Sequence, residues 1–415
     1  MLGRIAGATG PISRADLAAA TGLTRATVST LVETLIADRL VTEAGLTPRP
    51  GAGRPATGLR LSTQGPAGLG LEVNVDYLAA CVLDLAGGVR HHATLPGDQR
   101  GRTPDQALAD TGRLAAEAIA AAGAAGLTIV GAMLALPGLV EAPTGPLRLA
   151  PNLGWRDVDA LRLLRREPAL RTLPLTVDNE ANLAALAELS IGTAGDTFLY
   201  VSGEVGIGAG IVLDGRIFRG RHGWAGELGH IAIHPDGPPC RCGARGCLEQ
   251  YAGKEALLAA AAPIPGGAQR GAQARDTEAP LAAAAAPSLE QVAWRADAAD
   301  ATVLGALDAA GTALGVAIAG ALNLLDVASV VLGGDYRPLT PWLAPAVERE
   351  IAARVPAAPW STPRVYAASV GTDAATIGAA QAVIHAVLRD PTRAQRLLWR
   401  PAPGVRQEAD PAGTR

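Results

Sequence analysis

The sequence contains very little lysine, aromatic side chain or cysteine. Lys254 is the only lysine among 36 basic residues, and aromatic residues fill 3% of the 415 positions. Four cysteines are too few for a disulfide scaffold in a chain of this length. The net charge of -3 gives no whole-chain argument for nucleic acid. Hydrophobic residues make up 49%, which is enough to bury two or three domain cores and excludes a globally disordered chain.

The sequence also shows no long uninterrupted hydrophobic run. The first residues, MLGRIAGATGPISR, do not have the apolar stretch of a signal peptide. The most apolar segment, 309–334, is interrupted by Asn323 and Asp326. Its small residues predict a buried helix followed by a buried strand rather than a membrane span. We therefore expect a cytoplasmic protein without a membrane partner.

The first 63 residues differ in charge from the rest of the chain. This segment has a net charge of about +3 and the remainder about -6. Within 13–40, two short amphipathic patterns flank Gly22, with Ser13 and Thr24 as N-caps. The positions expected to face inward are Leu17, Ala18, Val28, Leu31, Val32 and Leu35. A Pro/Gly stretch at 47–58 between two extended patterns predicts a β-wing.

These features predict a winged helix-turn-helix domain over 1–63 that binds operator DNA. Its alternative is a helical hairpin used only for packing. Only LGRIAG remains for the helix that normally precedes such a unit, so we expect the true start to lie further upstream. Arginine and small hydroxyls at the start of the second helix suit phosphates and base edges. The residues expected to face DNA are Thr24, Arg25, Thr27, Ser29, Thr30 and, at the wing tip, Arg54.

The remaining chain alternates between strand and helix patterns, which indicates an α/β fold. Strands are expected in 70–85, 129–138 and 197–217, a helix in 104–124, and a strand, turn and helix in 174–192. We place the second domain at 66–390. An Ala/Pro/Gly-rich insert is expected at about 258–288, and a disordered tail at 391–415.

Three of the four cysteines lie within the eight residues CRCGARGC. Cys240, Cys242 and Cys247 can wrap one ion in a tight loop, and with one histidine they form a closed tetrahedral Zn²⁺ site. A closed site is structural rather than hydrolytic. Spacing alone leaves His230 and His234 as competing fourth ligands, because both share a face of an extended segment.

Two carboxylates bracket this cysteine loop. Glu227 and Glu249 can accept hydrogen bonds from paired hydroxyls of the kind that a sugar offers. The simpler interpretation is two solvated acids on the protein surface.

At these residues the sequence resembles the ROK family of bacterial sugar-responsive repressors and sugar kinases, and in particular its winged-helix repressors. GELGH, followed by a loop of the type C-x-C-G-x-x-G-C-x-E, carries the resemblance over residues 4–390. LALPGLV, APNLGW, DNEANLAALAE, GEVGIGAGIVLDGRI and VVLGGD support it. The resemblance implies an actin-like, ribonuclease-H-like ATPase fold with a sugar cleft between two lobes. It also implies homodimers or homotetramers.

The resemblance also assigns individual residues. It implies zinc ligands at His230, Cys240, Cys242 and Cys247, which resolves the histidine in favour of His230. His230 would bind the metal through one ring nitrogen and face the sugar with the other. The implied sugar contacts are Asn179, Glu180, Glu227, His230 and Glu249, with Gly138 and Asn152 as weaker candidates.

Two motifs that a kinase of this family needs are altered. The stretch that matches the phosphate-cradling loop contains no glycine, and Asp76 would place a carboxylate near the γ-phosphate. The catalytic aspartate is replaced by Glu180, which is one methylene longer. We therefore expect no catalytic residue and no residual kinase activity, but a sensor that kept the sugar cleft.

The sequence thus predicts a sugar-responsive DNA-binding transcriptional regulator that acts as a repressor. The alternative from the enzyme class is an ATP-dependent sugar kinase, similar to a glucokinase, with a fused DNA-binding domain. A third hypothesis is a zinc- or redox-responsive switch at the cysteine loop. A closed Cys₃His site without a neighbouring resolving cysteine argues against it.

Overall fold

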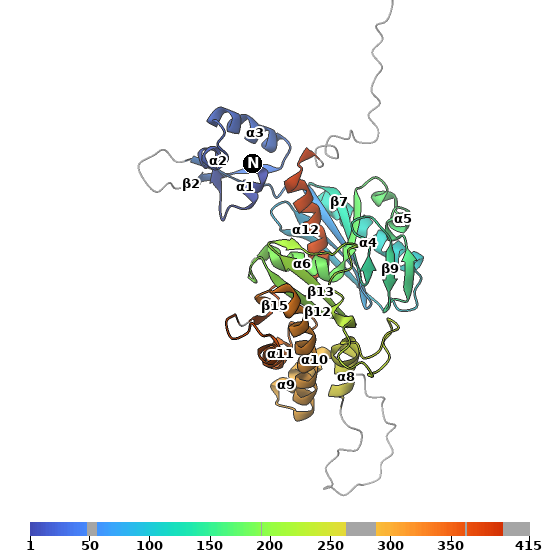
Figure 1. Ribbon diagram of the computed structural model, residues 1–415. Coiled ribbons are helices and arrows are strands. Elements are labelled where there is room, and N and C mark those ends of the chain that lie inside the picture. Colours follow the sequence, from blue (N-terminus) through green and yellow to red (C-terminus); the bar gives the residue numbers. More distant parts are fainter. Residues whose placement is uncertain (48–55, 192, 263–287, 362, 393–415) are drawn as a thin grey trace, which may run out of the picture.

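The computed structural model describes residues 1–47, 56–191, 193–262, 288–361 and 363–392. They form a small amino-terminal domain, which lies beside one end of a two-lobed body (Figure 1). The predicted insert falls largely on 263–287, and the predicted tail largely on 393–415, both outside the described residues. Arg54 at the predicted wing tip also lies outside them.

The amino-terminal domain has the predicted arrangement of helices and wing. Its elements are α1 (Leu2–Ala6), β1 (Ile12–Ser13), α2 (Arg14–Thr21), α3 (Arg25–Ala37), β2 (Val41–Thr47) and β3 (Ala56–Leu61). Ser13 caps α2 through a capping box with Asp16, and Thr24 caps α3 by accepting from the Thr27 amide. Gly22 adopts φ +70° between the helices. β2 and β3 pair antiparallel as the wing, and β1 adds to the free edge of β3.

The helix-turn-helix core follows the predicted stripe with one exception. Leu17, Val28 and Val32 are fully buried, but Leu31 is 42% exposed. Leu31 lies at the border of the apolar stripe of α3, and its expected inward position was wrong. α1 supplies a helix before this unit within LGRIAG, although it is only five residues long.

The first lobe is built on a five-stranded sheet. Its strands, in the order β11-β7-β4-β5-β6, are β11 (Leu175–Asn179), β7 (Leu127–Leu136), β4 (Gly65–Val73), β5 (Tyr77–Asp84) and β6 (Val89–Pro96). β11, β7 and β4 are parallel to one another, and β7 and β4 are nearly continuous in apolar residues because both faces of the sheet are covered there. α4 (Pro104–Ala124) packs on β4 and β5 and matches the predicted helix. A small sheet extends this lobe through β8 (Leu139–Val140), β9 (Leu147–Ala150) and β10 (Trp155–Val158), followed by α5 (Ala160–Leu164) and η1 (Pro168–Leu170).

The second lobe repeats the five-stranded plan. Its strands, in the order β14-β13-β12-β15-β16, are β14 (Arg216–Ile217), β13 (Ile207–Leu213), β12 (Phe198–Gly203), β15 (Ser329–Gly334) and β16 (Arg364–Ala367). Its helical elements are η2 (Leu228–His230), α7 (Glu249–Ala252), α8 (Lys254–Ala261), α9 (Leu289–Asp297), α10 (Ala301–Leu325) and α11 (Thr340–Arg354). Residues 258–261, which we expected to begin a loose insert, instead form the last turn of α8. Leu258 and Ala261 continue the apolar face of α8 that packs on α10.

The helix and strand predicted within 309–334 are observed as α10 and β15. Within the described residues, α10 is the one helix long and apolar enough to cross a membrane. Its apolar face is buried in the core of the second lobe, where it packs on α11.

Two helices lie at the junction of the lobes. α6 (Glu180–Ile191) follows β11 directly and packs on β13 of the second lobe. α12 (Ala374–Arg389) packs on α6 and crosses β4, β5 and β7 of the first lobe (Figure 1). The far end of α12 contacts α1, and both share one apolar cluster with α2 and α3. α12 is therefore a continuous connection between the lobe junction and the amino-terminal domain.

Candidate ligand cleft and metal centre

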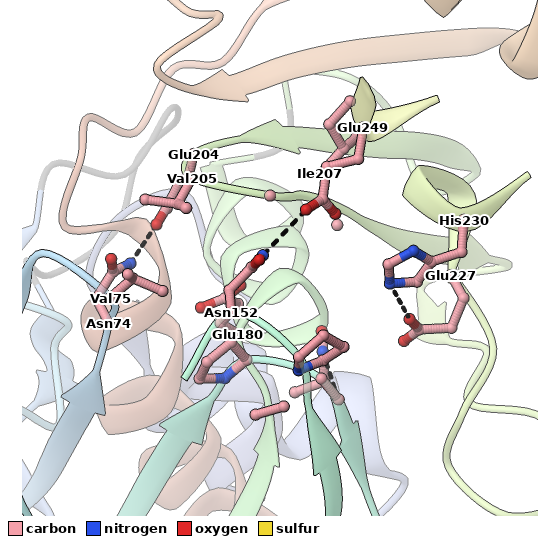
Figure 2. Close-up of a pocket in the computed structure, with 17 residues that line it drawn as sticks. Asn74, Val75, Asn152, Glu180, Glu204, Val205, Ile207, Glu227, His230 and Glu249 are labelled. Carbon is pink, nitrogen blue, oxygen red and sulfur yellow. Dashed lines mark hydrogen bonds and ion pairs between the residues drawn. The ribbon is translucent and has the colours of Figure 1, made fainter. Parts of the chain in front are cut away.

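The main cleft lies between the lobes and is lined by both of them. Its walls come from the turn after β4, the ends of β7 and β11, the β12–β13 hairpin, η2 and α7 (Figure 2). The cavity measures about 50 Å³, far below the roughly 300 Å³ at which ligand pockets usually begin. All seven residues predicted to contact a sugar line this one cavity: Gly138, Asn152, Asn179, Glu180, Glu227, His230 and Glu249.

The first lobe contributes Asn179 and Glu180 at the junction of β11 and α6. The Asn179 side chain accepts hydrogen bonds from the amides of Ala181 and Asn182, and so caps α6. Its Nδ2 donates to the Gly138 carbonyl at 3.0 Å. These hydrogen bonds hold the Asn179 side chain in place at the edge of the cleft. Glu180, in the first turn of α6, presents its carboxyl group to the cavity (Figure 2).

Asn152 and Glu249 join the two lobes across the cavity. Asn152 Nδ2 donates to Glu249 Oε1 at 3.2 Å (Figure 2). A Cβ atom on Gly206 would lie 2.7 Å from Asn152 Nδ2 and 3.1 Å from Glu249 Oε2, so this contact depends on the glycine. Gly138 has φ +91°, and a Cβ there would meet the Leu149 carbonyl at 2.1 Å. Because a Cβ atom at Gly138 or Gly206 would clash with its neighbours, glycine at these two positions lets the surrounding segments approach each other closely.

Burial raises the pKa values of several carboxyl groups around the cavity. Burial, with Glu204 as the next cause, raises the pKa of Glu180 well above its ordinary value. Burial and then Glu72 raise the pKa of Glu204 to about 8, and burial and then Glu249 raise that of Glu227 to about 7. Carboxyl groups that keep a proton near neutral pH can donate as well as accept hydrogen bonds. This set suits hydroxyl groups, each of which is both donor and acceptor.

The predicted metal ligands converge on one point. One donor atom each from His230, Cys240, Cys242 and Cys247 lies within 4.8 Å of every other. Cys242 Sγ and Cys247 Sγ are 3.8 Å apart, and Cys240 Sγ lies 3.9 Å from His230 Nδ1. Tetrahedral Zn–S bonds of about 2.3 Å place sulfurs about 3.8 Å apart, and all three thiols are free. The donor set therefore fits Zn²⁺.

The backbone of the loop explains the spacing of its ligands. Gly243 has φ +98° in the tight turn after Cys240, where its amide donates to the Cys240 carbonyl. Gly246 has φ +67°, and a Cβ there would lie 1.7 Å from the His234 carbonyl oxygen. Cys247 pairs with Ala232 as an isolated β-bridge. The loop is thus folded back on the segment after η2.

His230 connects the metal ligands to the cleft. Its Nδ1 faces Cys240, while its Nε2 lies 3.9 Å from Glu227 Oε2 on the cavity side (Figure 2). This is the orientation that we expected for a histidine shared between metal and ligand. The competing His234 packs edge-on against Tyr251 and lies outside the ligand cluster.

Sequence reasoning missed part of the cavity wall. Asn74, Val75, Glu204 and Val205 also line it, with the Asn74 side chain donating to the Glu204 carboxylate (Figure 2). The sequence indicated Asn74 and Val75 only as part of an altered phosphate loop, and Glu204 and Val205 only as part of a Gly-rich strand pattern. Nothing in the local pattern indicates that residues 130 positions apart form one wall.

The predicted DNA-contacting residues lie together at the start of α3. Thr24, Arg25, Thr27 and Thr30 are exposed, and Ser29 is half-buried. The hydroxyls of Thr24 and Thr27 are 2.9 Å apart and fix the first turn of the helix. This surface is unobstructed by the remainder of the described domain.

Comparisons with known proteins agree with this division of the chain. Residues 68–386 match the model of the ROK family, and residues 1–45 match the IclR helix-turn-helix domain. A xylose repressor of Bacillus spizizenii is 29% identical over 380 residues, which cover 90% of this chain and 91% of the repressor. A glucokinase of Halalkalibacterium halodurans is 35% identical over 260 residues, covering 60% of this chain and 74% of that protein.

A solved structure resembles nearly the whole molecule. The crystal structure of a ROK family transcriptional regulator, a homologue of the E. coli MLC protein, aligns with a TM-score of 0.75 and 27% identity. The alignment covers 96% of this chain and 97% of that one. These likenesses confirm the predicted fold class and the interpretation of the chain as a DNA-binding transcriptional regulator that responds to a sugar. With a family match that spans most of its length, the chain belongs to the ROK family.

Proposed function

We propose that the protein is a cytoplasmic repressor whose interlobe cleft binds a sugar or sugar derivative and that it does not phosphorylate that ligand. The observation that carries the proposal is the turn after β4. In place of a phosphate-cradling loop it presents Asn74, Val75 and Asp76, and all three engage the second lobe or its cavity. The site keeps hydroxyl-binding groups and lacks backbone room for phosphates.

The proposed sugar contacts divide between the lobes. Asn152, Asn179 and Glu180 come from the first lobe and its junction helix, and Glu227, His230 and Glu249 from the second. A ligand held by both sets stabilises one relative position of the lobes, so binding shifts the conformational equilibrium of the whole molecule.

We propose that α12 transmits this shift to the DNA-binding domain. Near its start, Thr376 donates to the buried carboxyl group of Glu72 on β4. A Cβ on Gly70 would lie 2.0 Å from the Thr376 carbonyl oxygen, so helix and strand are in backbone contact. At its other end, Val383, Ile384 and Val387 share an apolar cluster with α1. A rigid helix packed at both ends can couple two sites.

We propose a structural role for zinc. His230, Cys240, Cys242 and Cys247 would hold it, and bound Zn²⁺ would supply a closed tetrahedral cross-link that fixes the loop beside Glu249. His230 would then be held in the orientation that aims Nε2 at the cavity.

We further propose that the protein acts as a homodimer or homotetramer on two operator half-sites. A single α3 helix covers only a few base pairs of one major groove, and two copies on adjacent half-sites would read a longer operator. The exposed residues Thr24, Arg25, Thr27 and Thr30, with the half-buried Ser29, would face the groove.

Sugar binding and catalysis can be separated with two assays. Thermal-shift screening against D-xylose, D-glucose, N-acetyl-D-glucosamine and their phosphorylated forms identifies the ligand class. A coupled ADP-release assay with the same panel and Mg-ATP tests the glucokinase alternative, which the glucokinase likeness and the carboxyl group of Glu180 favour. We expect stabilisation by at least one sugar and no turnover. Turnover above about 1 s⁻¹, the low end for kinases, refutes the proposal.

A further inference from the structure

The only lysine in the sequence lies between carboxylates of the two lobes. Lys254 is the first residue of α8, and its Nζ is 3.0 Å from Asp76 Oδ2 and 3.3 Å from Asp335 Oδ2. Asp76 follows β4 in the first lobe, and Asp335 follows β15 in the second. One ammonium group thus links the segments that follow β4 and β15, two strands of separate sheets.

This ion pair adjoins a wall that divides the cleft into two cavities. Asn74, Glu204 and Val205 line the main cavity and also line a second cavity, whose other walls include Lys254 and Asp335. Val75 and Val205, one from each lobe, belong to one buried apolar cluster. We call Asn74, Val75, Glu204 and Val205 the dividing wall. It closes the proposed sugar pocket on the side where the resembled kinases would hold nucleotide phosphates.

The charges explain why the wall needs a cation. Asp76 and Asp335 approach the same point from opposite lobes, and without a positive charge between them they repel. Burial lowers the pKa of Lys254, but Asp335 and Asp76 outweigh this and leave the pKa above its ordinary value of 10.5. The ammonium group therefore stays charged at all pH values at which the protein functions.

A second basic residue supports the same junction. Arg100 of the first lobe donates to Glu255 of α8 at 3.0 Å and lies 3.6 Å from Asp76. Arg100, Asp76 and Lys254 are each between 29% and 38% exposed, so solvent and salt weaken these pairs but do not remove them.

We propose that Lys254 is a positioning residue for the sugar pocket: its ammonium group replaces the charge of a metal–nucleotide complex and holds the dividing wall closed. This inference rests on the proposed sugar site. It explains how the lobes can close on a sugar when no nucleotide is present. Lys254 does not line the main cavity and so acts through Asn74, Val75 and their partners.

The first test compares variants that differ in charge. Lys254→Met keeps most of the side-chain length, removes the cation from Asp335 and leaves Asp76 with Arg100 alone. It should weaken binding of the sugar identified by thermal shift about tenfold in calorimetry without ATP. Lys254→Arg keeps the charge and should stay within about threefold of wild type. The triple variant Lys254→Met, Asp76→Asn and Asp335→Asn removes the repulsion and should recover most of the affinity. A purely steric role for Lys254 predicts no such recovery.

The second test uses the rarity of the residue. Because the sequence contains one lysine, acylation by an amine-reactive ester followed by mass spectrometry reports on Lys254 alone, with the amino terminus as the internal control. Asp76→Asn should raise the rate of Lys254 acylation several-fold in the ligand-free protein. The bound sugar should lower the wild-type rate and leave the amino-terminal rate unchanged.

The outcomes separate this inference from the proposed function. If no sugar binds the wild-type protein, the proposed function fails, while the effect of Asp76→Asn on acylation still tests the ion pair. The inference is overturned if sugar binds wild type and Lys254→Met equally well, or if neither Asp76→Asn nor sugar changes the rate of Lys254 acylation. The proposed function stands in both cases.

Discussion

Gly70→Ala tests whether α12 couples the cleft to the DNA-binding domain. The added Cβ would lie 2.0 Å from the Thr376 carbonyl oxygen and 2.7 Å from the Ala380 amide nitrogen. Ordinary van der Waals contact begins near 3.4 Å, so α12 must move away from β4 by about 1.4 Å. Both obstructing atoms are backbone, and no side-chain rotation can relieve the contact.

The displacement has an energetic and a functional consequence. Overpacking of this kind costs about 1–3 kcal/mol, and the hydrogen bond from Thr376 to Glu72 is weakened in addition. We expect a melting temperature several degrees below wild type. We also expect that sugar still binds but changes operator affinity less than in wild type, because the far end of α12 packs against α1 of the DNA-binding domain.

A matched glycine substitution controls for composition. Gly320 lies on the exposed side of α10, where a Cβ would meet nothing within 4 Å. Gly320→Ala should be neutral or stabilise by up to about 1 kcal/mol through helix propensity. Differential scanning fluorimetry and fluorescence anisotropy with labelled operator measure both variants. If Gly70→Ala melts like wild type and keeps the full sugar response, the relay through α12 is refuted.

Three further predictions concern the metal, the DNA and a buried acid. Cys247→Ser should lose zinc measured by atomic absorption and lower the melting temperature and the sugar affinity together, whereas normal sugar binding in the zinc-free variant contradicts the proposed role of the metal. Arg25→Ala should weaken operator binding by about 1–3 kcal/mol and leave calorimetric sugar affinity unchanged; unaltered operator affinity means that α3 is not the reading helix. Folded Glu204 keeps a proton up to a pKa of about 8 that the unfolded chain releases near 4.5, so its contribution to stability is lost as pH rises through that window. In urea unfolding, the free energy of unfolding of Glu204→Gln should therefore rise relative to that of wild type between pH 5 and 8, by at most about 1.4 kcal/mol per pH unit. If both proteins show parallel dependence of stability on pH, the raised pKa of Glu204 is refuted.

The convergence of His230, Cys240, Cys242 and Cys247 was predictable because most of its information is local. Three ligands lie within eight residues, and the glycines that bend the loop lie between them. The helix-turn-helix was predictable for the same reason, since its caps, turn and apolar stripe fall within 13–40. Only the edge of the stripe at Leu31 was wrong, because periodicity does not say how far the covering helix extends.

The dividing wall was not predictable by the same means. Asn74 and Glu204 are 130 residues apart, and Asp76 and Lys254 are 178 apart. Their meeting depends on how two similar sheets face each other across α6 and α12. The sequence showed that the phosphate loop had changed, but only the fold shows that its side chains now bind the opposite lobe.

The central claim is that a sugar in the cleft changes operator affinity without nucleotide. The most direct measurement is an anisotropy titration of the full-length protein on a duplex that it selects from a random pool, with and without saturating sugar and with no ATP. We predict a change in Kd of about 5- to 150-fold, which is absent in Glu180→Ala because that variant lacks one of the carboxyl groups that we propose to bind the sugar. An identical Kd with a sugar that demonstrably binds, or a change that requires ATP, would contradict the account.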